Sequence, residues 1–204
     1  MFTKHDAKRI MDVLEGVGHW SHENFGHQES KIPDTATLWI VTGSKHPATL
    51  TYLAPLMGIT EELGEYVGAT TDEERKDALA DIGIYLCDFY YRTGLNKRGP
   101  DNIWSLEWCL RHIQADFPRR SATTIITERV GWLNHVILKT HQGIRGYDDI
   151  PKSRAELKET VVQLFLILDE ELRHAHDSSI MDALEEVFNK IVSKRNWKAN
   201  KVEG

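Results

Sequence analysis

Apolar residues recur every three to four positions along most of the chain, the spacing that places them on one face of an α-helix. In the first such segment they are Ile10, Val13, Leu14 and Val17. No stretch shows the sustained alternation that is typical of a half-buried strand. We therefore predict an all-α protein, a bundle of about seven helices, at about residues 4–17, 48–68, 70–90, 101–116, 122–139, 151–172 and 180–195.

The segments between these helices carry signals that begin and end helices. Residues 70–74 (TTDEE) resemble a helix start, because a Thr followed three residues later by Glu can form a capping box. Asp101 follows a turn and is placed to cap the fourth helix. Residues 26–47 are typical of a loop, and the apolar run at 38–41 within them is a candidate for one short strand.

Two pairs of segments from the two halves of the chain align without gaps. ITEELGE at 59–65 matches ITERVGW at 126–132, and KDALADI at 76–82 matches KETVVQL at 158–164. The alignment predicts a single domain, 1–204, built as an internal pseudo-dimer with a metal-binding half (1–117) and a degenerate half (118–204). Chance similarity between amphipathic helices is the alternative. The second half would have lost its acidic residues, with Glu62, Glu65 and Asp81 replaced by Arg129, Trp132 and Gln163.

Carboxylates gather on two of the predicted helices at spacings that give each group one helix face. So much negative charge repels strongly unless a cation lies between the groups. Ligation by oxygen alone suits Mg²⁺ or Mn²⁺ better than zinc. We therefore predict a metal-dependent active site between helices, whose acidic residues are Glu61, Glu62, Glu65, Asp77, Asp81 and Asp88.

An acidic helix face can also be ordinary solvated surface. Asp81 favours the functional interpretation, because it lies within an apolar run at 79–86 where an unpaired carboxylate is costly. For Asp77 and Asp88, surface salt bridges are an equally good explanation.

Composition narrows the class of protein. The 204 residues include 41% hydrophobic and 27% charged residues, which is ordinary for a globular protein. A net charge of −6 argues against a general nucleic-acid binder. There is no apolar run long enough for a membrane span and no signal segment, and Cys87 and Cys109 show no metal-type spacing. We expect a cytoplasmic protein that binds neither nucleic acid nor membrane.

Several segments together resemble the MazG-like all-α nucleoside triphosphate pyrophosphohydrolases, a superfamily that includes the dimeric dUTPases. The resemblance depends first on the Glu-Glu-x-x-Glu motif at 61–65 and on the acidic pair that ends at Asp81. Further similar segments touch most of the chain: WSHENFG at 20–26, PLMGIT at 55–60, IGIYLCDF at 82–89, LNHVILKTHQGIRG at 133–146 and VSKRNWK at 192–198.

The resemblance implies which residues bind metal. Glu62, Glu65 and Asp81 occupy the family's Mg²⁺-ligand positions. The family usually has a further Glu three residues before that Asp, where this chain has Ala78, so Asp77 or Asp88 would have to substitute. Glu61 would lie beside the metal or act as the base that orients water.

The resemblance also implies the reaction, which is cleavage of a nucleoside triphosphate to the monophosphate and pyrophosphate. Cations would stabilise the leaving group, since phosphoryl transfer depends on charge neutralisation. Family members form dimers that share their sites, so we expect the second half to supply substrate-binding groups and allow for a homodimer of pseudo-dimers. The predicted substrate-binding residues are Lys139, Gln142, Arg145, Lys194 and Arg195.

One alternative belongs to a different functional class. A nucleotide-binding or nucleotide-sensing protein on the same scaffold would also explain Ala78 and the degenerate second half. The basic C-terminal segment has its own simpler explanation, because cations are favourable in the last turn of any helix.

Overall fold

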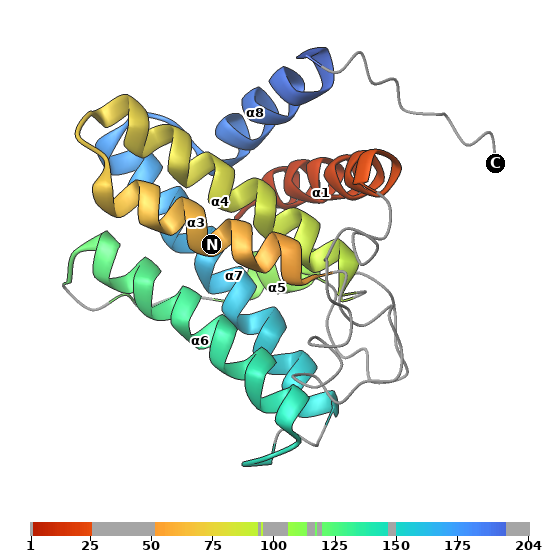
Figure 1. Cartoon of the computed structure of the whole chain (residues 1–204). Coiled ribbons are helices and arrows are strands. Elements are labelled where there is room, and N and C mark those ends of the chain that lie inside the picture. Colours follow the sequence, from red (N-terminus) through yellow and green to blue (C-terminus); the bar gives the residue numbers. More distant parts are fainter. Residues whose placement is uncertain are drawn as a thin grey trace.

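The computed structural model describes residues 2–25, 52–93, 95, 106–113, 117, 120–146 and 150–194. Every regular element within these ranges is a helix, which confirms the all-α prediction (Figure 1). The helices are α1 (Lys4–Phe25), α3 (Leu53–Gly68), α4 (Asp72–Arg92), α5 (Leu106–His112), α6 (Ala122–Gln142), α7 (Ile150–Ala175) and α8 (Ile180–Lys194). The candidate strand at 38–41 and the cap at Asp101 lie outside the described residues.

Helix α1 is longer than the sequence predicted. It continues past Val17 to Phe25 because its two glycines are contact positions and do not end the helix. A Cβ at Gly16 would lie 2.7 Å from the ring of Phe188, and one at Gly18 would lie 2.2 Å from the ring of Tyr91. Neighbouring side chains therefore fill the space that these glycines leave open.

The predicted start of α4 is confirmed in detail. The Thr71 side chain accepts a hydrogen bond from the backbone N–H of Glu74, and the Glu74 carboxylate accepts one from the backbone N–H of Thr71. This capping box satisfies donors that the first helical turn cannot satisfy itself. It also limits the connection between α3 and α4 to residues 69–71, so the two helices form a tight hairpin.

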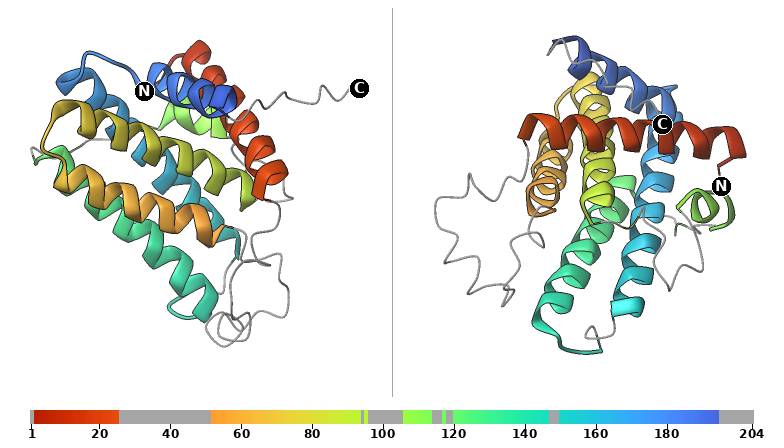
Figure 2. Two further views of the ribbon diagram at one scale, coloured as in Figure 1. Left: turned by 45° about the horizontal axis from the view of Figure 1, so that its top comes forward. Right: turned by 90° about the vertical axis from the view of Figure 1, so that its right-hand side faces the viewer.

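Two helical hairpins make up the centre of the molecule. Helix α3 packs along α4 and α6 packs along α7, while α4 contacts α7 and α3 contacts α6. Helices α1 and α8 lie on one side of α4, and α6 lies on the opposite side of the molecule (Figures 1 and 2). The core between them includes the fully buried side chains of Phe89, Tyr90 and Phe165.

The order of the hairpins agrees with the proposed repeat, which aligns α3 with α6 and α4 with α7. Aligned helices also contact each other, as two related halves would. The equivalence of the halves and the pseudo-dimer stay a prediction, since like packing on like is also common among unrelated helical hairpins. No helix in the described part of the chain is long and apolar enough to cross a membrane.

Candidate functional site

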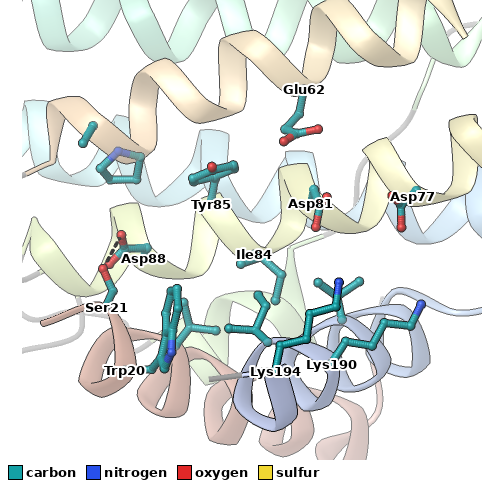
Figure 3. A pocket seen from close by; sticks show the side chains of 15 residues that line it. Trp20, Ser21, Glu62, Asp77, Asp81, Ile84, Tyr85, Asp88, Lys190 and Lys194 are labelled. Atoms are coloured by element: carbon teal, nitrogen blue, oxygen red, sulfur yellow. Dashed lines mark hydrogen bonds between the residues drawn. The ribbon is translucent and has the colours of Figure 1, made fainter. Parts of the chain in front are cut away.

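A cleft of about 510 Å³ lies between α1, α3, α4 and α8. Figure 3 shows carboxylates from α3 and α4 along one side and lysines from α8 along the other. Aromatic and polar side chains line the end nearer α1. The lining residues are Val17, Trp20, Ser21, Ala54, Pro55, Glu62, Asp77, Asp81, Ile84, Tyr85, Asp88, Val187, Lys190, Ile191 and Lys194.

The acidic side of the cleft is formed by Glu62 of α3 and by Asp77 and Asp81 of α4. The two aspartates are four residues apart and therefore share a helix face. Glu62 points from α3 toward the part of α4 that carries Asp81 (Figure 3). The structure thus brings together three of the predicted acidic residues.

Burial and mutual repulsion perturb two of these carboxylates. Burial, and then the charges of Asp81 and Glu65, raise the pKa of Glu62 to about 7. Burial, and then the charge of Asp77, raise the pKa of Asp81 to about 6, with Lys190 acting in the opposite direction. Both groups are only partly removed from solvent, yet the cleft lacks enough positive charge to hold them ionised at their usual pKa values.

Ala78 stands where the resembling family has an acidic ligand. Its side chain is 3% exposed and packs in the core, whereas the adjacent Asp77 is exposed to the cleft. The carboxylate available before Asp81 is therefore displaced by one residue along α4. Of the two substitutes that the sequence left open, Asp77 is the one beside Asp81.

Asp88 has a different environment at the other end of the cleft. It is buried and forms an ion pair with Arg92, whose Nε lies 2.8 Å from its Oδ1. The hydroxyl of Ser21 donates a hydrogen bond of 2.9 Å to the other carboxylate oxygen. Burial raises the pKa of Asp88, and it outweighs the opposing effects of Arg92 and Ser21. Both oxygens already have partners, which favours a structural role.

The donor set of the cleft fits a hard divalent cation, because its closest carboxylates supply oxygen ligands and lack a neutralising charge. Glu62, Asp77 and Asp81 are the residues that would hold it. In the described residues, no three acidic, histidine or cysteine side chains already converge closely enough to form a metal site. Glu61 and Glu65 are exposed and are not among the lining residues.

Helix α8 supplies the positive charge. Lys190 and Lys194 are four residues apart on α8, and both line the cleft on the side opposite the carboxylates (Figure 3). Lys194 was predicted as a substrate-binding residue, whereas Lys190 was not. The spacing of four residues was the available signal, but it is equally typical of a solvated helix end. Arg195 lies outside the described residues.

The other predicted substrate-binding residues are not part of this cleft. Lys139, Gln142 and Arg145 lie at or just after the C-terminal end of α6, and none of the α6 side chains that the structure describes lines the cleft. Lys139 donates a hydrogen bond of 2.9 Å to the side chain of Gln142, and Arg145 is exposed in the turn that follows. Within one chain the structure does not bring these three residues to the carboxylates.

Two aromatic lining residues were also missed as site residues. Trp20 comes from α1 and Tyr85 from α4. The ring of Tyr85 packs against Gly58 of α3, where an added Cβ would lie 2.5 Å from the ring. The glycine within the segment PLMGIT therefore makes room for an aromatic side chain of the cleft.

Comparison of the chain with protein-family models, with curated proteins and with solved structures found no match.

Proposed function

We propose that the protein is a Mg²⁺-dependent nucleoside triphosphate pyrophosphohydrolase that releases a nucleoside monophosphate and pyrophosphate. One observation carries the proposal: uncompensated carboxylates and a pair of lysines face each other across one cleft. Metal-bound triphosphates require both kinds of group, since a cation bridges the carboxylates to the phosphates and further cations neutralise the remaining charge. The proposal agrees with the resemblance to MazG-like enzymes, with Mn²⁺ as an alternative metal.

The residues of the cleft would have separate roles in binding the metal and the phosphate chain. When bound, Mg²⁺ would neutralise phosphate oxygens and favour attack by water. Glu62, Asp77 and Asp81 would hold the metal, while Lys190 and Lys194 would contact the phosphate chain. A water oxygen would form a bond to the α-phosphorus, the bond from that phosphorus to the bridging oxygen would break, and pyrophosphate would leave with the electron pair.

The proton from that water needs an acceptor near the metal. The resemblance assigns this role to Glu61, which is exposed and does not line the cleft. Glu65 is likewise exposed and does not line the cleft, although its charge contributes to the raised pKa of both Glu62 and Asp81. Glu61 and Glu65 are therefore assigned roles near the metal only because they are close to Glu62 on α3.

A nucleotide-binding or nucleotide-sensing protein is the second candidate, and one observation favours it. Ala78, which is buried in the core, stands where the resembling family has an acidic ligand, as expected of a scaffold that has lost catalysis. Pyrophosphate release from a panel of nucleoside triphosphates, with Mg²⁺ or Mn²⁺, separates the two functions.

The active enzyme is expected to lose turnover on Glu62→Gln or Asp81→Asn while keeping its helical circular dichroism. Glu73→Gln is the matched control, because Glu73 is an exposed carboxylate at the start of α4 outside the cleft. Nucleotide binding without pyrophosphate release would support the sensing function and contradict the enzymatic one.

Location and assembly complete the proposal. Cys87 and Cys109 are both buried free thiols, which supports a reduced, cytoplasmic location. Lys139, Gln142 and Arg145 would reach a phosphate chain only through another copy of the protein, so their predicted role goes with the proposed homodimer of pseudo-dimers.

A further inference from the structure

We propose that Lys190 is an internal counter-ion of the cleft, which offsets part of the charge of the aspartates of α4 in the metal-free protein and contacts phosphate once a divalent cation occupies the acidic side. The inference rests on the proposed function, because it assigns a role within the same site. It concerns a residue that neither the acidic motif nor its family resemblance singles out.

The first support is the charge environment of Lys190. Its Nζ lies 2.8 Å from Oε1 of Glu186, one turn earlier on α8. Glu186 raises the pKa of Lys190 most, and Asp77 and Asp81 raise it further. Lys190 also lines the same cleft as Asp77 and Asp81. Lys190 therefore lies between a carboxylate outside the cleft and two carboxylates inside it.

The second support is that α8 itself is firmly placed. Arg9 of α1 binds Glu185 through two hydrogen bonds of 2.8 and 2.7 Å, and it also donates one of 2.7 Å to Asp182. On the other side of α8, the side chain of Leu184 packs against Gly83 of α4, where an added Cβ would lie 2.9 Å from it. The backbone is thus held from two helices, and a lysine side chain is long enough to turn between partners.

These contacts give opposite expectations for two ligands. A positive charge beside Asp77 and Asp81 opposes a divalent cation there, by the same Coulomb interaction that attracts a phosphate chain. Removing the charge of Lys190 should therefore strengthen metal binding and weaken phosphate binding. A lysine that only supports the helix surface would change neither.

The experiment compares wild type with Lys190→Met and Lys8→Met. Lys8 is the matched control, because it also pairs with a carboxylate four residues away on its own helix but lies outside the cleft. Binding of Mn²⁺ alone is measured by electron paramagnetic resonance, without nucleotide. Binding of inorganic pyrophosphate is then measured by calorimetry at saturating Mn²⁺. Circular dichroism checks that each variant folds.

For Lys190→Met we expect Mn²⁺ to bind roughly three- to tenfold more tightly and pyrophosphate to bind at least as much more weakly, given a partly screened unit charge. Lys8→Met should match wild type in both titrations. Equal Mn²⁺ affinity in wild type and Lys190→Met, or weaker binding of both ligands, would overturn the inference while leaving the proposed enzyme intact. Failure of wild type to bind Mn²⁺ at all would overturn the metal site itself and this inference with it.

Discussion

Replacing Glu62 by Gln should stabilise the metal-free protein at pH 8, although it removes a group that the proposed function needs. The folded protein raises the pKa of Glu62 from 4.5 to about 7. Ionisation of this carboxyl therefore destabilises the folded protein. The penalty is absent below pH 4.5, grows between pH 4.5 and 7, and is complete above pH 7. Gln keeps the size of the side chain and cannot ionise, so it removes that penalty.

The magnitude follows from the size of the pKa change. For a fully buried group, a pKa change of this size would lower the free energy of unfolding by about 3 kcal/mol. Glu62 is only half-buried, and solvent screening of its interactions with neighbouring carboxylates reduces the expected gain to about 1–2 kcal/mol. At pH 5 the gain should fall to about a quarter of its value at pH 8, because pH 5 is only slightly above the pKa of 4.5 that the carboxyl has in the unfolded chain.

The assay is urea unfolding in the presence of EDTA at pH 5 and pH 8, followed by circular dichroism. In a second series without EDTA, wild type should gain stability on titration with Mg²⁺, since a ligand that binds only the folded state stabilises it. Glu62→Gln should lose most of this gain. A variant that is less stable than wild type at pH 8, or equally stabilised by Mg²⁺, would refute the idea that Glu62 is an uncompensated metal ligand.

Three further substitutions test how the cleft is built. Gly58→Ala places a Cβ against the ring of Tyr85 and should cost about 1–3 kcal/mol by urea unfolding, with a raised KM as the ring moves toward the cleft. Arg92→Met leaves Asp88 buried without its ion-pair partner and should lower the free energy of unfolding by about 3 kcal/mol, whereas an unchanged urea midpoint would contradict a structural ion pair. Thr71→Ala removes a helix cap and should lower thermal stability by about 1 kcal/mol without changing turnover.

Helix type and most helix positions were predictable because apolar spacing and capping are local properties. The capping box at Thr71 begins α4 where the sequence indicated. The left-handed C-cap at Gly143, with a φ of 59°, ends α6 at Gln142, close to the predicted end at 139. The end of α1 was predicted wrongly. Gly16 and Gly18 resemble helix breakers in the sequence, and only the packing of α4 and α8 shows that aromatic rings require them.

The acidic side of the candidate site was also visible in the sequence, since the spacing of Asp77 and Asp81 fixes their common face. On the opposite side only Lys194 was predicted, and that prediction came from the family resemblance. Lys190 and Trp20 reach the cleft through the packing of α8 and α1 on α4, which no local pattern encodes. Asp88 lies on the same helix face as Asp81. However, it forms a buried ion pair with Arg92, four residues further along α4.

The most direct test of the proposed function is product identity, followed by ³¹P nuclear magnetic resonance while the protein acts on nucleoside triphosphates with Mg²⁺. The proposal predicts nucleoside monophosphate and pyrophosphate in equal amounts, and no such products from Asp81→Asn. Release of nucleoside diphosphate and phosphate, or turnover that survives in Asp81→Asn, would contradict it.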